Sequence, residues 1–273
     1  MALAGAYDGL AARWDADAGR VYRPLGRALV AASPIPLNAQ LVVDVGSGTG
    51  AVAEAAAARG ARVVVADRST GMVAHPAGRT WPAVAADARA LPFRPATFDG
   101  ALAGFVVNHL HPGPALAEMA RVVRPGGAVL ASTWAAGADP VKAAVDAVVV
   151  SWGWVPPAWY VAMKTEVLPI SGVASALAAA AHQSGLGDVQ ASVCHPHLGL
   201  RDPRAVVAYR LAVPHIAPWL ATLDRRARVE LTRQAVRAVT LPREGWRPAV
   251  IILTARVAGQ SSRGAAARSS ADA

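Results

Sequence analysis

The 273-residue sequence contains a single cysteine, Cys194, and few charged residues. One cysteine cannot form an internal disulfide, and no group of Cys and His residues has the spacing of a structural zinc site. Charged residues make up only 16% of the chain and apolar residues 54%, which argues against intrinsic disorder. A chain of this length and composition is expected to bury a sizeable core.

Long uninterrupted apolar runs are also missing. The longest candidate, residues 143–163, contains Asp146 and the pair Pro156-Pro157, so it would make a poor membrane span. The first 14 residues include Asp8 and Arg13 and lack the continuous apolar segment of a secretion signal. We therefore expect a cytoplasmic protein that does not act at a membrane.

Lysine is scarce as well, with two residues against 25 arginines and a net charge of +9. Most of this excess lies after residue 200, where 13 arginines face five acidic residues. The arginines alternate with acidic and apolar residues, as on solvated helix faces, and their abundance is also typical of a GC-rich genome. Charge alone therefore does not imply a nucleic-acid partner.

Short apolar runs alternate with helical segments of about ten residues between residues 41 and 134. Five strands are predicted there, at residues 41–45, 62–66, 83–86, 98–107 and 128–134. Two more are predicted at residues 188–200 and 248–257. This alternation is typical of an α/β fold with a doubly wound, mostly parallel sheet.

Three regions flank or interrupt the predicted sheet. Residues 1–38 are expected to form one or two amphipathic helices that act as a lid. The domain itself would span residues 39–258, with an irregular, Trp- and Pro-bearing insertion at 135–170 and a mainly helical one at 201–245. Residues 259–273, rich in Ser and Ala, are expected to be a disordered tail.

A glycine-rich loop, Gly46-Ser47-Gly48-Thr49-Gly50, follows the first predicted strand and opens a helix. Glycines allow the backbone to turn sharply and to approach a ligand, and the free N–H groups of a helix start attract anionic groups. Asp67 ends the second strand, where a carboxylate can accept both ribose hydroxyls. These features alone fit either NAD or S-adenosylmethionine (SAM).

Five sequence blocks favour SAM. They are residues 44–50, Asp67, residues 87–93 (Asp-Ala-Arg-Ala-Leu-Pro-Phe), Phe98-Asp99 and residues 121–127 (Arg-Val-Val-Arg-Pro-Gly-Gly). In order and spacing, residues 40–134 resemble the class I SAM-dependent methyltransferases, within the group that includes ubiquinone/menaquinone-biosynthesis and many natural-product methyltransferases. Nicotinamide-dependent enzymes lack the third and fifth blocks. The resemblance implies a seven-stranded sheet whose last strand is antiparallel.

The resemblance also implies roles for individual residues at the cofactor site. Residues that would contact the methionine part are Asp44, Gly46, Ser47, Gly48 and Gly50. Asp67 would hold the ribose with Arg68 beside it, and Asp87 would accept the adenine amino hydrogens with Ala88 beside the ring. Met72 would pack in the core or at the adenine edge, and Asn108 would lie near the sulfonium.

Methyl transfer requires the acceptor atom to be held close to the methyl group, water to be excluded and, for some acceptors, a proton to be removed. His109, just after the fourth strand, is the candidate base, ahead of His111, His195 and His197. The aromatic residues expected to wall an apolar acceptor pocket are Tyr7, Trp14, Tyr22, Trp134, Trp152 and Trp154, together with Trp159 and Tyr160 of the same insertion.

The expected reaction is therefore methylation of a small, largely apolar or aromatic metabolite in biosynthesis, without a metal ion. His195 and His197 would share one side of a strand but lack a carboxylate partner for a metal. Three alternatives stay open: a related fold that catalyses a non-methylating reaction, an NAD-dependent oxidoreductase, and an RNA methyltransferase. The Asn108-His109-Leu110-His111 segment departs from the motif of adenine-N6 enzymes, which disfavours a nucleic-acid substrate. The acceptor atom and the oligomeric state are left undetermined.

Overall fold

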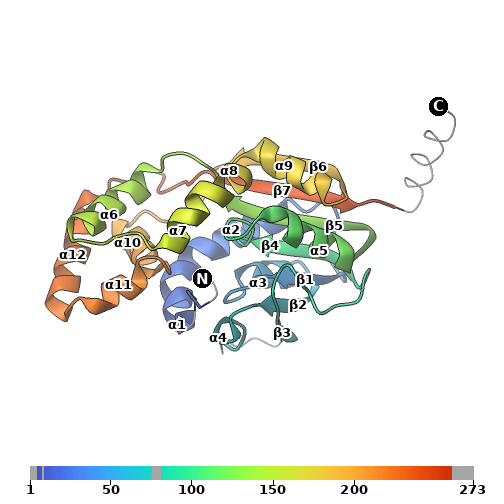
Figure 1. Cartoon of the computed structure of the whole chain (residues 1–273), viewed down its shortest axis with the longest axis horizontal. Helices are drawn as coiled ribbons and strands as arrows, with labels where there is room; N and C mark the ends of the chain where they lie inside the picture. The colour runs from blue at the N-terminus through green and yellow to red at the C-terminus, as the bar shows by residue number, and fades with distance from the viewer. Residues whose placement is uncertain (1–4, 8, 76–80, 260–273) are drawn as a thin grey trace.

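The computed structural model describes residues 5–7, 9–75 and 81–259. Seven strands form one sheet in the order β3-β2-β1-β4-β5-β7-β6 (Figure 1). The five parallel strands are β1 (Leu41–Val45), β2 (Arg62–Asp67), β3 (Ala83–Ala85), β4 (Phe98–Gly104) and β5 (Val123–Trp134). The last strand, β7 (Val250–Val257), is antiparallel to both β5 and β6 (Leu186–Cys194). The predicted fold class is thus confirmed.

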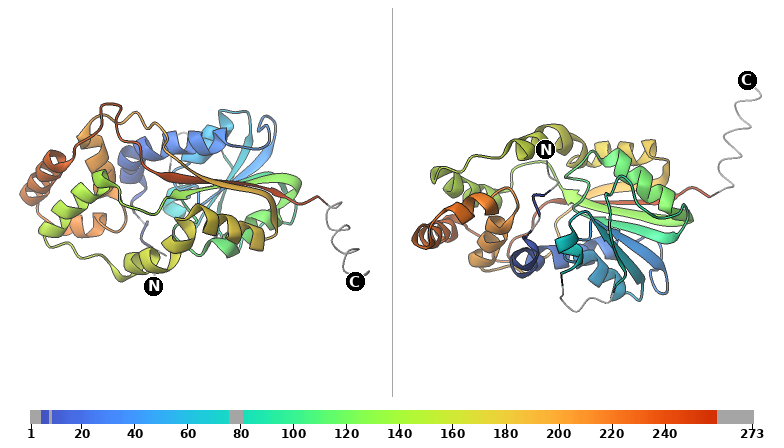
Figure 2. Two further views of the ribbon diagram at one scale, coloured as in Figure 1. Left: turned by 90° about the horizontal axis from the view of Figure 1, so that it is seen from above. Right: turned by 60° about the horizontal axis from the view of Figure 1, so that its bottom comes forward.

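Helices cover both faces of the sheet, as the edge-on view in Figure 2 shows. On one face lie α2 (Gly19–Ala31) and α3 (Ala51–Ala57), which pack on Val42 and Leu102. On the other face lie α5 (Pro112–Val122) and α9 (Ala174–Gln183), which pack on Val43, Ala101 and their neighbours. The short helix α4 (Thr70–Val73) follows β2. Successive side chains of a strand point to opposite faces of the sheet. Because helices cover both faces, the central strands carry apolar side chains on both.

A continuous helical segment precedes the sheet. It consists of α1 (Ala11–Arg13), a π-helical turn η1 (Trp14–Ala18) and α2. The π-helical turn buries Trp14 and Ala18. The predicted N-terminal helices are therefore present, and they lie against the end of the sheet where the site is found.

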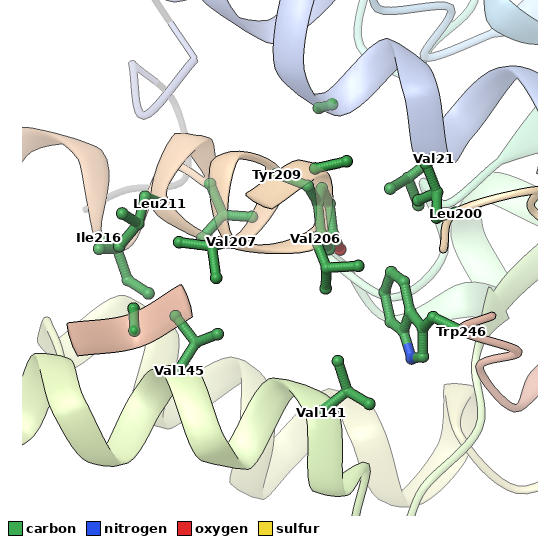
Figure 3. Close-up of a cluster of buried hydrophobic side chains, with 14 of the residues drawn as sticks. Val21, Val141, Val145, Leu200, Val206, Val207, Tyr209, Leu211, Ile216 and Trp246 are labelled. Carbon is green, nitrogen blue, oxygen red and sulfur yellow. The ribbon is translucent and has the colours of Figure 1, made fainter. Parts of the chain in front are cut away.

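Seven further helical segments form a layer beyond the carboxyl ends of β4 and β5 (Figure 1). They are α6 (Pro140–Ser151), α7 (Ala158–Ala162), η2 (Met163–Val167), α8 (Leu168–Ser171), α10 (Pro203–Ala212), α11 (Ala217–Thr222) and α12 (Arg225–Ala238). Figure 3 shows its core, in which Val141 and Val145 of α6 face Val206 and Val207 of α10.

The expectation that residues 135–170 are irregular was wrong. Asp139 caps α6 by accepting hydrogen bonds from the backbone N–H groups of Val141 and Lys142, and Pro140 occupies the first helical position. Two strand ends were also placed too late: β4 ends at Gly104 and β6 at Cys194, two residues before Pro196. Of the predicted tail, only Gly259 lies within the described residues.

Candidate functional site

Two cavities meet at the carboxyl ends of β1 and β4. The glycine-loop cavity, about 650 Å³, is enclosed by the loop after β1, the end of β2 and residues 86–89. The aromatic cavity, about 790 Å³, lies between the end of the sheet and the helical layer and contains Trp134, Trp159, Tyr160, Tyr209 and Trp246. Four side chains line both cavities: Tyr7, Trp14, Tyr22 and His109. Ligands in the two cavities would therefore meet at these four residues.

The glycine loop has a backbone that only glycine adopts easily. Gly46, Gly48 and Gly50 have φ values of +64°, +52° and +88°. A Cβ at position 46 would lie 2.2 Å from a methyl carbon of Val106, so no larger residue fits there. Asp44 lies below the loop with 1% exposure and accepts a hydrogen bond of 2.9 Å from the Ala53 N–H of α3. Asp44 thus fixes the first turn of α3 against the strand.

Asp67 joins the glycine loop to the segment before α4. Its two carboxylate oxygens accept hydrogen bonds of 2.8 Å from the N–H groups of Gly48 and Ser69. Burial raises the pKa of this carboxyl, while the backbone donors oppose the rise. Met72 is buried nearby and lines the same cavity. A carboxylate at a strand end beside a glycine loop is suited to a diol ligand.

Asp87 closes the opposite side of the glycine-loop cavity, next to the buried Ala88. Its carboxylate accepts a hydrogen bond from the Arg89 backbone and lies 2.7 Å from the Arg89 guanidinium. Arg68 lies 4.0 Å away. The Arg89 guanidinium is the main reason that the pKa of Asp87 falls to about 2. Asp87 is therefore ionised but engaged with Arg89.

Two predicted cofactor residues lie elsewhere. Gly50 is the N-cap of α3 and donates a 2.8 Å hydrogen bond to the Ser47 carbonyl. Asn108 lines the aromatic cavity rather than the glycine-loop cavity. Its Oδ1 is buried and has no hydrogen-bond partner within the described part of the chain. Asn108 is thus placed to contact the ligand of the aromatic cavity.

His109 and Tyr7 form the junction between the cavities. The Tyr7 hydroxyl lies 3.0 Å from His109 Nε2, although the two residues are 102 positions apart. The other ring nitrogen, Nδ1, is buried and has no hydrogen-bond partner among the residues that the structure describes. Burial lowers the pKa of His109 to about 4. The imidazole is therefore neutral at physiological pH, with one nitrogen left for a ligand.

This lowered pKa gives a first prediction about pH dependence. An ordinary histidine becomes protonated as the pH falls through about 6.5, whereas His109 stays neutral down to about pH 4. A catalytic step that needs neutral His109 should therefore show no loss of rate between pH 8 and pH 5.5. Measured kcat at saturating acceptor should not fall over this range, and a fall centred near pH 6.5 in the wild-type protein, absent from a His109→Gln variant, would contradict the assignment.

The aromatic cavity is walled differently from the sequence-based expectation. Trp134 lines it as predicted, but Trp152 and Trp154 point elsewhere. The Trp152 indole donates a 2.9 Å hydrogen bond to Gln234 of α12, and the Trp154 indole donates one to the His215 carbonyl. Their predicted substrate contacts are therefore replaced by structural ones. Trp159 and Tyr160 line the cavity as expected, and the two rings that the sequence did not indicate, Tyr209 and Trp246, come from distant parts of the chain.

Within the described ranges, no group of three or more His, Cys, Asp or Glu side chains could hold a metal ion. His195 and His197 follow the end of β6 instead of alternating along it. In the same ranges no single helix is long and apolar enough to cross a membrane, and only the pair Ala158–Ser171 and Ala174–Gln183, bent by 78°, passes that test jointly.

The sheet order with an antiparallel last strand, the glycine loop and the aspartates that end β2 and follow β3 define the class I SAM-dependent methyltransferase fold. Residues 43–131 match the family described as "Methyltransferase domain". Residues 43–131 are thus similar to this methyltransferase family, and the sheet around them has the strand order of the class I fold.

Two curated relatives match about half of this chain in sequence. It is 38% identical over 136 residues to a demethylmenaquinone methyltransferase from Mycolicibacterium vanbaalenii, a match covering 46% of this chain and 57% of the relative. It is 34% identical over 141 residues to the bifunctional biotin-biosynthesis protein BioHC from Cellvibrio japonicus, covering 50% of this chain and 28% of the relative. The chain therefore spans a little over half the length of the first relative and about a quarter of the second.

The likeness to solved structures extends further along the chain. A phosphoethanolamine N-methyltransferase from Haemonchus contortus, solved with phosphomonomethylethanolamine and S-adenosylhomocysteine, has a TM-score of 0.55 and 16% sequence identity. The match covers 92% of this chain and 60% of that one. At this identity the likeness concerns the fold alone.

Proposed function

We propose that the protein transfers a methyl group from SAM to a small, largely apolar or aromatic molecule, of the kind made in natural-product biosynthesis. The observation that carries this proposal is the meeting of two cavities of ligand size at His109 and Tyr7. The cavity on one side has the glycine loop and strand-end carboxylates of a nucleoside site. The cavity on the other side is walled by aromatic rings, which suit an apolar acceptor.

The residues that line the glycine-loop cavity suit the chemical groups of SAM. Asp67 would accept the ribose hydroxyls, and the loop at Gly46 and Gly48 leaves space because no Cβ intrudes. Asp87 has to release one carboxylate oxygen from Arg89 to accept the adenine amino group. SAM, when bound, supplies a methyl group on a sulfonium that is activated for in-line displacement.

The residues at the junction would position the acceptor and take its proton. If the Tyr7 hydroxyl accepts a hydrogen bond from His109 Nε2–H, Nδ1 carries the lone pair and can receive a proton from the acceptor. Asn108 Oδ1, buried without a partner among the described residues, can accept a hydrogen bond from the same molecule. Tyr22 and Trp14 stack with their ring centroids 5.1 Å apart, and with both ligands bound these rings would help to keep water away from the junction.

The ribose assignment predicts a loss of cofactor affinity in an Asp67→Ala variant. Removing charge-assisted hydrogen bonds should weaken SAM binding by about 1–3 kcal/mol, or roughly 5- to 150-fold. Calorimetric titration with SAM measures this change. The matched control is Glu230→Ala, which removes an exposed carboxylate on α12. Equal affinities of the wild-type protein and the Asp67→Ala variant would remove Asp67 from the cofactor site.

The proposed activity is tested by incubating the protein with methyl-labelled SAM and a panel of aromatic phenols, amines and acids. Label is expected in a product that depends on both the protein and one acceptor. SAM bound without label appearing in any product would favour a non-methylating reaction on the same fold.

A further inference from the structure

Lys142 is a largely buried cation in the aromatic cavity to which the proposed function gives no role. It is one of only two lysines in the chain and lies in the first turn of α6. Its side chain is 18% exposed, and it lines the aromatic cavity together with Trp134 and Trp246. A lysine is rarely placed in such surroundings unless its charge is paired.

The ammonium group of Lys142 contacts aromatic rings but has no carboxylate within hydrogen-bond distance among the described residues. Nζ lies 3.4 Å from the ring centroid of Trp134 and 5.5 Å from that of Trp246. The nearest carboxylate oxygen, Asp139 Oδ2, is 3.9 Å away, and that oxygen accepts a hydrogen bond from the Trp246 indole. Among the described residues, the carboxylate paired with Nζ is thus too distant to accept a hydrogen bond from it.

The other charges in the cavity do not supply the missing acceptor. Asp146 is engaged by Arg210 through two contacts of 2.7 Å. The remaining charged or titratable groups on the wall are Lys164, Glu244, Arg247, the histidines His109, His195 and His215, and the tyrosines Tyr7, Tyr22, Tyr160 and Tyr209. Burial lowers the pKa of Lys142 to about 7; the Asp139 carboxylate opposes this shift, whereas Arg210 and Lys164 add to it. An anion bound next to Lys142 would therefore stabilise its charged form.

We propose that Lys142 binds the carboxylate of the acceptor, whose apolar part lies among Trp134, Tyr209 and Trp246, so that the acceptor is an aromatic carboxylic acid. This inference rests on the proposed function, because it names the substrate class of the same site. Trp134 contacts both Lys142, whose Nζ lies 3.4 Å from its ring centroid, and Tyr22 of the junction, whose ring centroid lies 6.2 Å away. The carboxylate would therefore be held away from the reacting atom.

The test compares two probes of nearly equal shape, 2-naphthoate and 2-naphthamide, by calorimetry in the presence of S-adenosylhomocysteine. At pH 6.0 the wild-type protein should bind naphthoate at least about tenfold more tightly than naphthamide, through a charge-assisted hydrogen bond. At pH 8.5 Lys142 is mostly neutral in the free protein, and this preference should fall by roughly tenfold. Similar affinities for both probes at pH 6.0, or binding of neither, would overturn the proposal.

Variants of Lys142, with one control outside the cavity, test whether this lysine causes the preference for naphthoate. Lys142→Met removes the buried charge and should bind both probes alike, whereas Lys142→Arg should prefer naphthoate at both pH values because arginine stays charged. The matched control is Arg228→Met, which removes an exposed cation on α12 that lines neither cavity and should keep the wild-type preference at pH 6.0. A preference for naphthoate that survives in Lys142→Met would contradict the role of Lys142.

The outcomes separate this inference from the proposed function. Methyl transfer without a Lys142-dependent preference for carboxylates would refute the inference alone. A Lys142-dependent preference without any methylated product from SAM would refute the proposed function and leave the anion site standing.

Discussion

A His109→Ala variant is expected to turn over about 100-fold more slowly than the wild-type protein while binding SAM with nearly the same affinity. The expectation follows from the position of the imidazole. It lines both cavities, and its Nε2 is held by Tyr7 at 3.0 Å. Its Nδ1 has no partner within the described residues and can take a proton from the acceptor. Comparing kcat with the calorimetric affinity for SAM separates catalysis from binding.

Two further variants control this experiment. His111→Ala removes a nearby exposed histidine that lines neither cavity and should behave as the wild-type protein does. Tyr7→Phe keeps the ring but removes the hydroxyl that orients His109, so it should slow turnover less than His109→Ala does. A normal rate in His109→Ala would eliminate His109 as the base.

An Asp146→Ala variant is expected to lose about 3–5 kcal/mol of unfolding free energy, because it leaves a buried charge without its partner. The Arg210 guanidinium is 8% exposed and donates two hydrogen bonds of 2.7 Å to the Asp146 carboxylate. Burial by itself would lower the pKa of Arg210, but the neighbouring carboxylate raises it above its usual value. Denaturant unfolding followed by circular dichroism measures the loss.

The matched comparison uses a surface ion pair of the same type. Glu230 and Arg233 on α12 are both exposed, so Glu230→Ala should leave the unfolding free energy nearly unchanged. Replacing both members of the buried pair, in Asp146→Ala/Arg210→Met, should recover most of the stability by removing the unpaired charge. Equal losses in Asp146→Ala and Glu230→Ala would show that the buried pair has no special role.

The sheet could be predicted because its strands are apolar on both faces and separated by turn residues. Val42 and Val43 face opposite helical layers, and this double burial gives the continuous apolar run that marks a parallel strand. The glycine loop and Asp67 were also predictable, because their positions relative to strand ends follow from the sequence. The structure places most of the predicted cofactor residues around one cavity.

The helical layer and the aromatic cavity were harder to predict, because they depend on contacts between distant segments. Tyr7 meets His109 across 102 residues, and Tyr209 and Trp246 lie far along the chain from Trp134. The abundance of tryptophan near residues 152 and 154 indicated an aromatic region but not the direction of each ring. The capping of α6 by Asp139 and Pro140 was a signal in the sequence that could have been used.

The central claim, a SAM site in the glycine-loop cavity, is tested most directly by titrating the purified protein with SAM, S-adenosylhomocysteine and NAD in one calorimetric series. Our account predicts micromolar binding of the first two ligands at one site per chain and no heat from NAD. Binding of NAD alone would contradict it and would assign the glycine loop to a dinucleotide.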